Sequence, residues 1–196
     1  MGLYPKNIKL GQTTQTGVKR LAVDALSAVK YTVTPDAAGR ATIHAAVTLG
    51  EDAQTITTAI TNPDVPRVLA VAGTATGTTP TGGEGAVLIT GTDIADEVLT
   101  ETITAVAGQT VVGTKAFKTV ASIGMPIGSG NIAVGTTDVL GLPACLPFNT
   151  VLYAYLNEAR EGTAPTVTVS ATVAALNTVD LNSALDGSAV DVVFLV

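Results

Sequence analysis

Apolar and polar residues alternate along much of the chain, most clearly from Ala86 to Pro126. Successive side chains of a β-strand point to opposite faces of a sheet, so this alternation predicts half-buried strands. Val and Thr are frequent in the run; both are stiff at χ1 and fit a pleated surface. Glycines divide the run, which therefore predicts three successive strands at residues 86–92, 97–106 and 114–122.

The same pattern continues on both sides of this run, and no long window shows the 3.6-residue periodicity of a helix. Turn-forming residues recur roughly every ten residues, as they do in all-β domains. Further strands are expected at residues 21–34 (whose first half also fits a short helix), 40–49, 54–60, 67–75, 131–134, 151–160, 166–173 and 189–196. The pattern predicts an all-β fold, an antiparallel β-sandwich or barrel-like domain with an extended N-terminal arm.

Two segments depart from the strand pattern. Residues 1–25 are polar, rich in Gln and Thr, and only weakly periodic, so we expect an extended arm or a single strand added to a neighbour, followed by a β-rich body over residues 26–196. Residues 73–85 are small, polar and rich in glycine, which predicts an exposed loop or a long hairpin tip. This loop is the natural seam if the body divides into two β subdomains.

A hairpin is predicted around Gly108-Gln109, between the strands at 97–106 and 114–122, with Gly113 at a β-bulge. Opposite charges are expected to pair across this hairpin, at about 0.2–1 kcal/mol for each pair. The residues concerned are Glu97 and Glu101 on one strand and Lys115 and Lys118 on the next.

Charged residues make up only 13% of the chain, about half the usual share of roughly 25%. A chain that is weakly charged and apolar on average is expected to cover surface against partners, as a component of an assembly. The net charge of −6 is unevenly distributed, because the first thirty residues carry five cations against Asp24 alone. This basic segment is expected to be either a solvated tail or an arm that docks on an acidic neighbour.

The remaining body is acidic and repels nucleic acid, so we expect no nucleic-acid partner. No segment approaches the roughly 18 uninterrupted apolar residues of a membrane span, so we also expect no membrane partner. The first residues include no apolar run of the kind found in a secretory signal, and none is expected.

The residues that could carry chemistry are few. The segment from Gly108 to Lys115 nearly spells a phosphate-binding loop, but Thr precedes the Lys and a strand follows, so we interpret it as a hairpin turn. His44 lies in an alternating strand and is expected to be a structural or surface residue. Cys145 lies in an apolar stretch and is expected to be a buried structural thiol.

One His and one Cys cannot fill a four-ligand zinc shell. The acidic group near the start of the strand at 97–106 is expected to be a solvated strand edge, with adventitious Ca²⁺ as the alternative. Its members are Asp93, Asp96, Glu97 and Glu101. We therefore expect no enzymatic activity, no cofactor and no metal.

Four stretches carry a resemblance to known proteins: TNPDVPRVLAVAGTA (61–75), VLITGTDIADEVLTETITAVAG through KTVASIGMP (87–126), DVLGLP (138–143) and residues 157–196. They resemble virion structural proteins of tailed bacteriophages, the small Thr- and Val-rich proteins usually encoded near the major capsid protein. The resemblance implies a non-enzymatic capsid decoration (cement) protein. Such a protein is made in the bacterial cytoplasm and bound to the virion surface as a homo-oligomer, with the major capsid protein as its partner.

Two alternatives remain open: a tail-tube or head–tail connector subunit, and a surface-exposed module that binds host glycan. The residues expected at an interface are Lys6, Lys9, Lys19 and Arg20 in the arm, and Tyr153 and Tyr155. The two tyrosines are spaced i, i+2 and therefore share one face of their strand.

Overall fold

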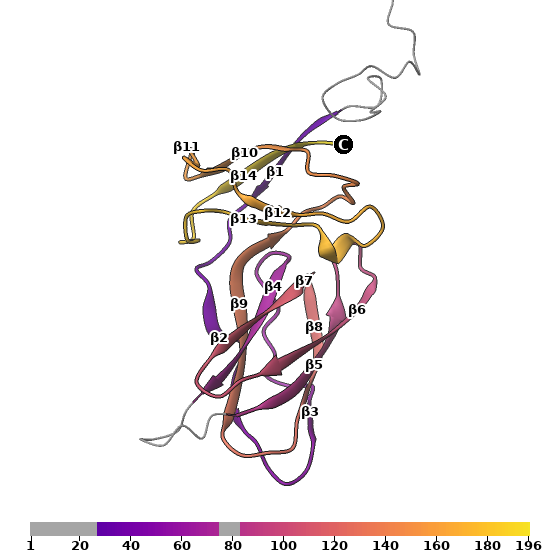
Figure 1. The fold of residues 1–196 in the computed structure, drawn as a ribbon, viewed down its shortest axis with the longest axis vertical. Coiled ribbons are helices and arrows are strands. Elements are labelled where there is room, and N and C mark those ends of the chain that lie inside the picture. The colour runs from indigo at the N-terminus through magenta and orange to yellow at the C-terminus, as the bar shows by residue number, and fades with distance from the viewer. Residues whose placement is uncertain (1–26, 75–82) are drawn as a thin grey trace, which may run out of the picture.

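The computed structural model describes residues 27–74 and 83–196, and this part of the chain is all-β (Figure 1). Its strands are β1 (Ala28–Val33), β2 (Gly39–Thr48), β3 (Gln54–Ile56), β4 (Arg67–Thr74), β5 (Gly85–Thr92), β6 (Val98–Ala105), β7 (Thr110–Phe117), β8 (Thr119–Met125), β9 (Asn131–Gly141), β10 (Val151–Leu156), β11 (Ala159–Arg160), β12 (Thr166–Thr168), β13 (Thr178–Asp180) and β14 (Val190–Leu195). A short 3-10 helix, η2, covers Ala174–Leu176. The predicted all-β, antiparallel fold is confirmed.

The strands form three antiparallel sheets. The first has the order β1-β14-β10-β11, and the third has the order β3-β8-β5-β6. The second has the order β12-β13-β9-β4-β7, with β2 also paired to β9. Figure 1 shows the first sheet at one end of the molecule and the third toward the other, with β9 running along the long axis between them.

Two hydrophobic cores result from this arrangement. The first core lies between the second and third sheets, where Val71 of β4, Ile89 of β5 and Val134 of β9 are fully buried. The second core lies under the first sheet, where Val192 and Phe194 of β14 are fully buried. Burial of each such side chain stabilises the fold by about 1.5–3 kcal/mol.

β9 contributes to both cores, because Ile132 and Val134 belong to the first and Leu140 belongs to the second. The change from one core to the other therefore falls along this strand. The predicted seam at 73–85 lies elsewhere: β4 and β5 flank it, and both supply residues to the first core. Residues 75–82 of that seam lie outside the described residues.

Several predicted strands match closely. Those at 40–49, 67–75, 86–92 and 97–106 correspond to β2, β4, β5 and β6 within one residue at each end. The segment 151–160 is instead a hairpin of β10 and β11, because Asn157 and Glu158 both adopt positive φ (50° and 64°) and reverse the chain. The strand β13 lies outside every strand that the sequence predicts.

The predicted strand at 114–122 is wrong. The segment is divided at Lys118: its first part is the end of β7 and its second part is the start of β8, and these two strands belong to different sheets. Alternation fails at this point because Ala116 and Phe117 are both buried in succession. The Lys118 amide donates to Thr92 O at 2.8 Å, which fixes the chain as it passes from one sheet to the other.

The predicted hairpin ladder is also wrong, although its turn is present with Gly108 at φ +70°. β6 pairs with β5 and β7 pairs with β4, so these neighbours in sequence are not hydrogen-bonded as a ladder. The Glu101 carboxylate joins them instead, because it accepts from the Thr114 amide at 2.6 Å and from Thr114 Oγ1 at 2.9 Å.

Gly113 makes that approach possible, because a Cβ there would lie 2.6 Å from Glu101 Oε2. The predicted bulge is found at this place, since the four steps of β7 from Val112 to Ala116 lie opposite only two steps of β4, from Val68 to Ala70. The predicted charge pairs differ: Lys118 pairs with Asp96 at 2.7 Å, and Lys115 Nζ donates to Thr100 O.

Candidate functional site

The first sheet packs one face on the second core and presents the other to solvent. Along β14, Val190, Val192 and Phe194 are fully buried, and the residues between them point the opposite way. The strand register extends this second face across the whole sheet. We call it the outer sheet face; its residues are Ala28, Lys30 and Thr32 of β1, Asp191, Val193 and Leu195 of β14, Tyr153 and Tyr155 of β10, and Arg160 of β11.

Tyr153 and Tyr155 lie together on this face, as their spacing predicts, because Ala154 between them is buried in the second core. The Tyr153 side chain is 40% exposed. The β10–β11 hairpin brings Arg160 back over the Tyr153 ring, with Cζ 4.6 Å from the ring centroid. This cation–π contact orders an aromatic and a cationic group side by side at the surface.

A polar group occupies the other side of the face. Asp191 accepts from Lys30 Nζ at 2.8 Å and from Thr32 Oγ1. The hydrogen bond from Lys30, and then that from Thr32, lower the pKa of Asp191 below its usual value. The outer sheet face therefore combines a fixed ion pair with tyrosine and aliphatic side chains.

A groove of ≈ 400 Å³ opens beside Tyr153. The groove is lined by Leu152 and Tyr153 of β10 and by Arg160, Glu161 and Pro165. Leu152 is 46% exposed, so the groove adds apolar surface to that of the face.

The remaining predicted residues are placed as follows. Lys6, Lys9, Lys19 and Arg20, with the rest of the predicted arm 1–25, lie outside the described residues. His44 is partly exposed on β2, and its Nδ1 lies 2.8 Å from Ala45 O.

Cys145 is exposed, so its predicted burial is wrong. Its neighbours Leu142 and Leu146 take the buried positions in the second core. The segment between them is a loop, which turns the thiol to solvent.

The predicted solvated strand edge is wrong for two members of the acidic group, because Asp93 and Glu101 are buried. Glu101 binds Thr114 of β7, whereas Asp93 and Asp96 stabilise the β5–β6 turn. Asp93 Oδ1 accepts from the Ala95 amide at 2.8 Å and from the Glu97 amide at 3.1 Å, and Asp96 pairs with Lys118. Across residues 27–74 and 83–196, no group of three or more His, Cys, Asp or Glu side chains is arranged to hold a metal ion.

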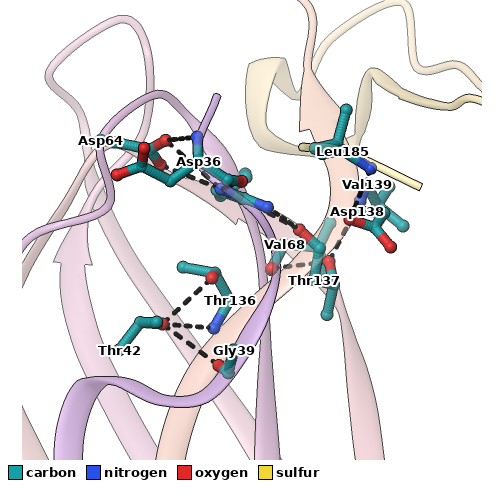
Figure 2. A network of polar contacts seen from close by, with 11 residues as sticks. Asp36, Gly39, Thr42, Asp64, Val68, Thr136, Thr137, Asp138, Val139 and Leu185 are labelled. Atoms are coloured by element: carbon teal, nitrogen blue, oxygen red, sulfur yellow. Dashed lines mark hydrogen bonds and ion pairs between the residues drawn. The ribbon is translucent and has the colours of Figure 1, made fainter. Parts of the chain in front are cut away.

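Sequence reasoning missed a buried polar network where the two cores meet (Figure 2). Arg67 is fully buried at the start of β4, and its guanidinium donates to Thr137 O and Asp36 O, each at 2.9 Å, and to Asp64 Oδ1 at 3.0 Å. Figure 2 also shows Thr137 bound to Val68, where Oγ1 donates to the carbonyl at 2.8 Å. Asp64 and Arg67 are three residues apart in a proline-rich segment, and this spacing is the sequence signal that could have indicated the ion pair.

Two carboxylates lie close together near this junction. Asp138 of β9 and Asp180 of β13 both line a cleft of ≈ 510 Å³. Burial raises the pKa of Asp180, and the charge of Asp138 raises it further. Asp138 also accepts from the Leu185 amide at 3.2 Å.

Comparison of the chain with protein-family models, with curated proteins and with solved structures found no match. Among the described residues, no helix has the length and apolar character needed to cross a membrane.

Proposed function

We propose that this chain is a non-enzymatic structural protein of a tailed-bacteriophage virion, which binds the exterior of the assembled capsid and stabilises the shell. The observation that carries the proposal is the outer sheet face, where Tyr153, Tyr155 and Arg160 form a surface suited to a protein partner. Exposed tyrosine and arginine are enriched at protein–protein interfaces. The resemblance of residues 61–196 to phage virion proteins supports the same assignment.

The mechanism proposed for stabilisation is thermodynamic linkage. A protein that binds the assembled shell better than free subunits shifts the equilibrium toward the shell by mass action. The basic arm, with Lys6, Lys9, Lys19 and Arg20, adds a second contact to the major capsid protein. No cofactor, nucleic acid or membrane takes part in this role.

The proposal is tested by co-sedimentation of the purified protein with phage shells that lack it, with bound copies counted. Saturable binding at hundreds of copies per particle is expected for a protein that repeats over a capsid. Removal of residues 1–20 is expected to abolish binding and leave the β-rich fold intact. Full occupancy by the truncated protein would show that the arm makes no contact.

The tail-tube or head–tail connector alternative predicts a different result in the same experiment. In that case the protein does not bind shells and forms rings or tubes alone, which electron microscopy detects.

The host-glycan alternative is favoured by one observation, the groove beside Tyr153. Its lining combines an aromatic ring with Asn149, Arg160 and Glu161, which can bind hydroxyl groups. Binding of the native protein to host-cell polysaccharide, lost in Tyr153→Ala, would favour this role over capsid binding.

A further inference from the structure

The edge of the first sheet formed by β1 has backbone groups that no described strand pairs. β14 lies on one side of β1, and within residues 27–74 and 83–196 no strand lies on the other. Ser27 and Val196 form a doubly hydrogen-bonded pair, at 2.8 and 3.0 Å, just before β1 begins. The register then continues from Ala28 to Val33 without a shift.

This pair determines which backbone groups face outward. In an antiparallel ladder, hydrogen-bonded residues alternate with residues whose N–H and C=O point away from the partner strand. Ser27, Val29, Tyr31 and Val33 therefore bond to the β14 side. The N–H and C=O groups of Ala28, Lys30 and Thr32 point to the open edge, which is a template for one further strand.

The side chains of β1 define what such a strand must contain. Val29, Tyr31 and Val33 are half-buried against the second core, whereas Ala28, Lys30 and Thr32 are exposed on the outer sheet face. An added strand extends both faces, so its residues must alternate between apolar and polar. Its apolar side chains would cover the half-exposed edge of the second core.

The arm contains a segment of this kind. In residues 6–11, KNIKLG, Ile8 and Leu10 alternate with Asn7 and Lys9. Ile8 and Leu10 can therefore continue the core side while Lys9 continues the outer side.

Charge favours the same contact. Residues 1–26 carry four cations and one acid, whereas residues 27–196 carry six cations and fifteen acids. A basic arm is attracted to the acidic body of any copy, with a strength that falls as salt rises.

We propose that residues 6–11 of one copy add as a strand to the β1 edge of a second copy. Pairing within one copy would require the chain to reverse between residues 12 and 26. That stretch contains no proline and no asparagine, and its only glycine is Gly17. Its β-branched Thr13, Thr14 and Thr16 have a preference for extended conformations, and an extended chain of this length, at about 3.3 Å per residue, is long enough to reach a neighbouring copy.

The contact gives a surface and a partner for the homo-oligomer that the resemblance to phage virion proteins implies, and to that extent it rests on the proposed function. It is tested with the protein alone, so failure to bind shells leaves it unaffected.

The first experiment compares donor variants of the full-length chain by sedimentation velocity over a range of concentrations. Ile8→Asp with Leu10→Asp removes the apolar side chains of the donor segment and does not touch the β-rich body. Gln12→Asp with Gln15→Asp adds the same charge to the same arm outside that segment. We expect the first pair to weaken association at least about tenfold, or about 1.4 kcal/mol, and the second to have little effect.

The second experiment changes the acceptor edge. Lys30→Pro removes an N–H that faces outward and leaves the ladder with β14 intact. Lys30→Ala loses the same ion pair with Asp191 but keeps the N–H. We expect only the proline variant to lose association, and circular dichroism verifies that both remain folded.

Mixing the two defective proteins separates exchange between copies from pairing within one. The Ile8→Asp/Leu10→Asp chain retains an acceptor edge and the Lys30→Pro chain retains a donor, so the mixture is expected to form heterodimers. A native protein that stays monomeric at every concentration overturns the proposal, as does association that Lys30→Pro leaves unchanged or a mixture that forms no heterodimer.

Discussion

Arg67 combines complete burial with a full charge, and its position accounts for this. Each nitrogen of its guanidinium has an acceptor among Thr137 O, Asp36 O and the Asp64 carboxylate. The side chain thereby ties β4 and β9 to two loops at the junction of the two cores. A buried charge is tolerated only when it is paired in this way.

Replacing Arg67 by Ala is expected to destabilise the fold by about 2–5 kcal/mol, because it empties a fully buried side-chain site and leaves the Asp36 and Thr137 carbonyl groups without this donor. Chemical denaturation measures the loss. Arg40→Ala, which removes an exposed arginine on β2, is the control and is expected to change stability by less than about 0.5 kcal/mol. Equal losses in the two variants would contradict a structural role for the buried network.

The charge of Asp180, unlike that of Arg67, is expected to lower the stability of the folded state, and this effect depends on pH. Burial and the Asp138 charge raise its folded pKa, so the folded state binds its proton more tightly than the unfolded state. The ionised group therefore costs stability above its folded pKa, and the cost disappears below its unfolded pKa of about 3.9. Asp180→Asn is expected to raise the Tm at pH 7 and to leave it unchanged near pH 3.

Asp186 is the matched control, because hydrogen bonds from Ser188 lower its pKa. Asp186→Asn is expected to give no gain at pH 7. A gain from Asp186→Asn as large as that from Asp180→Asn would indicate that general charge reduction is responsible.

At the scale of the element, β9 holds the molecule together because it pairs with β2, β4 and β13 and supplies both cores. Its contact with β2 is close: a Cβ at Gly135 would lie 1.8 Å from Gly39 O and 2.5 Å from the Arg40 carbonyl carbon. Both are backbone atoms, which cannot move without displacing the irregular start of β2.

Gly135→Ala is therefore expected to destabilise the fold by about 1–3 kcal/mol or more, as overpacking does in a well-packed core. Gly124→Ala in β8 is the control, since its Cβ would meet Leu88 Cβ at an ordinary 3.5 Å. Thermal unfolding of the two variants measures the difference. A Gly135→Ala protein as stable as the Gly124→Ala protein would contradict the close β2–β9 approach.

The strands themselves are predictable, because alternation records which residues face a core. β4, β5 and β6 were located within one residue on this basis. Alternation does not record which strand lies beside which, so the division between β7 and β8 and the pairing of β6 with β5 were missed. Those choices depend on Glu101, Gly113 and Lys118, whose partners are distant or lie on other strands.

The candidate site was predictable in part for the same reason. The common face of Tyr153 and Tyr155 follows from their spacing. Arg160 over Tyr153 depends instead on the two-residue turn at Asn157 and Glu158, which the sequence does not distinguish from a continuing strand. Arg67 resembles any strand-flanking arginine until the folded chain brings Thr137 and Asp36 to it.

At the scale of the whole molecule, the outer sheet face at one end is the surface that we propose to meet the capsid. The exposed apolar residues Val98 and Ile127 lie in the part of the chain that surrounds the first core instead, in β6 and in the turn after β8. They provide a control with a similar change in surface chemistry away from the proposed interface.

The most direct measurement is a binding isotherm of the full-length protein on phage shells that lack it, for three proteins side by side. We predict that Tyr153→Ser with Tyr155→Ser weakens binding at least about tenfold, or about 1.4 kcal/mol. Val98→Ser with Ile127→Ser is predicted to bind as the native protein does. Native-like binding by the tyrosine variant, or no binding by the native protein at any concentration, would contradict capsid docking through the outer sheet face.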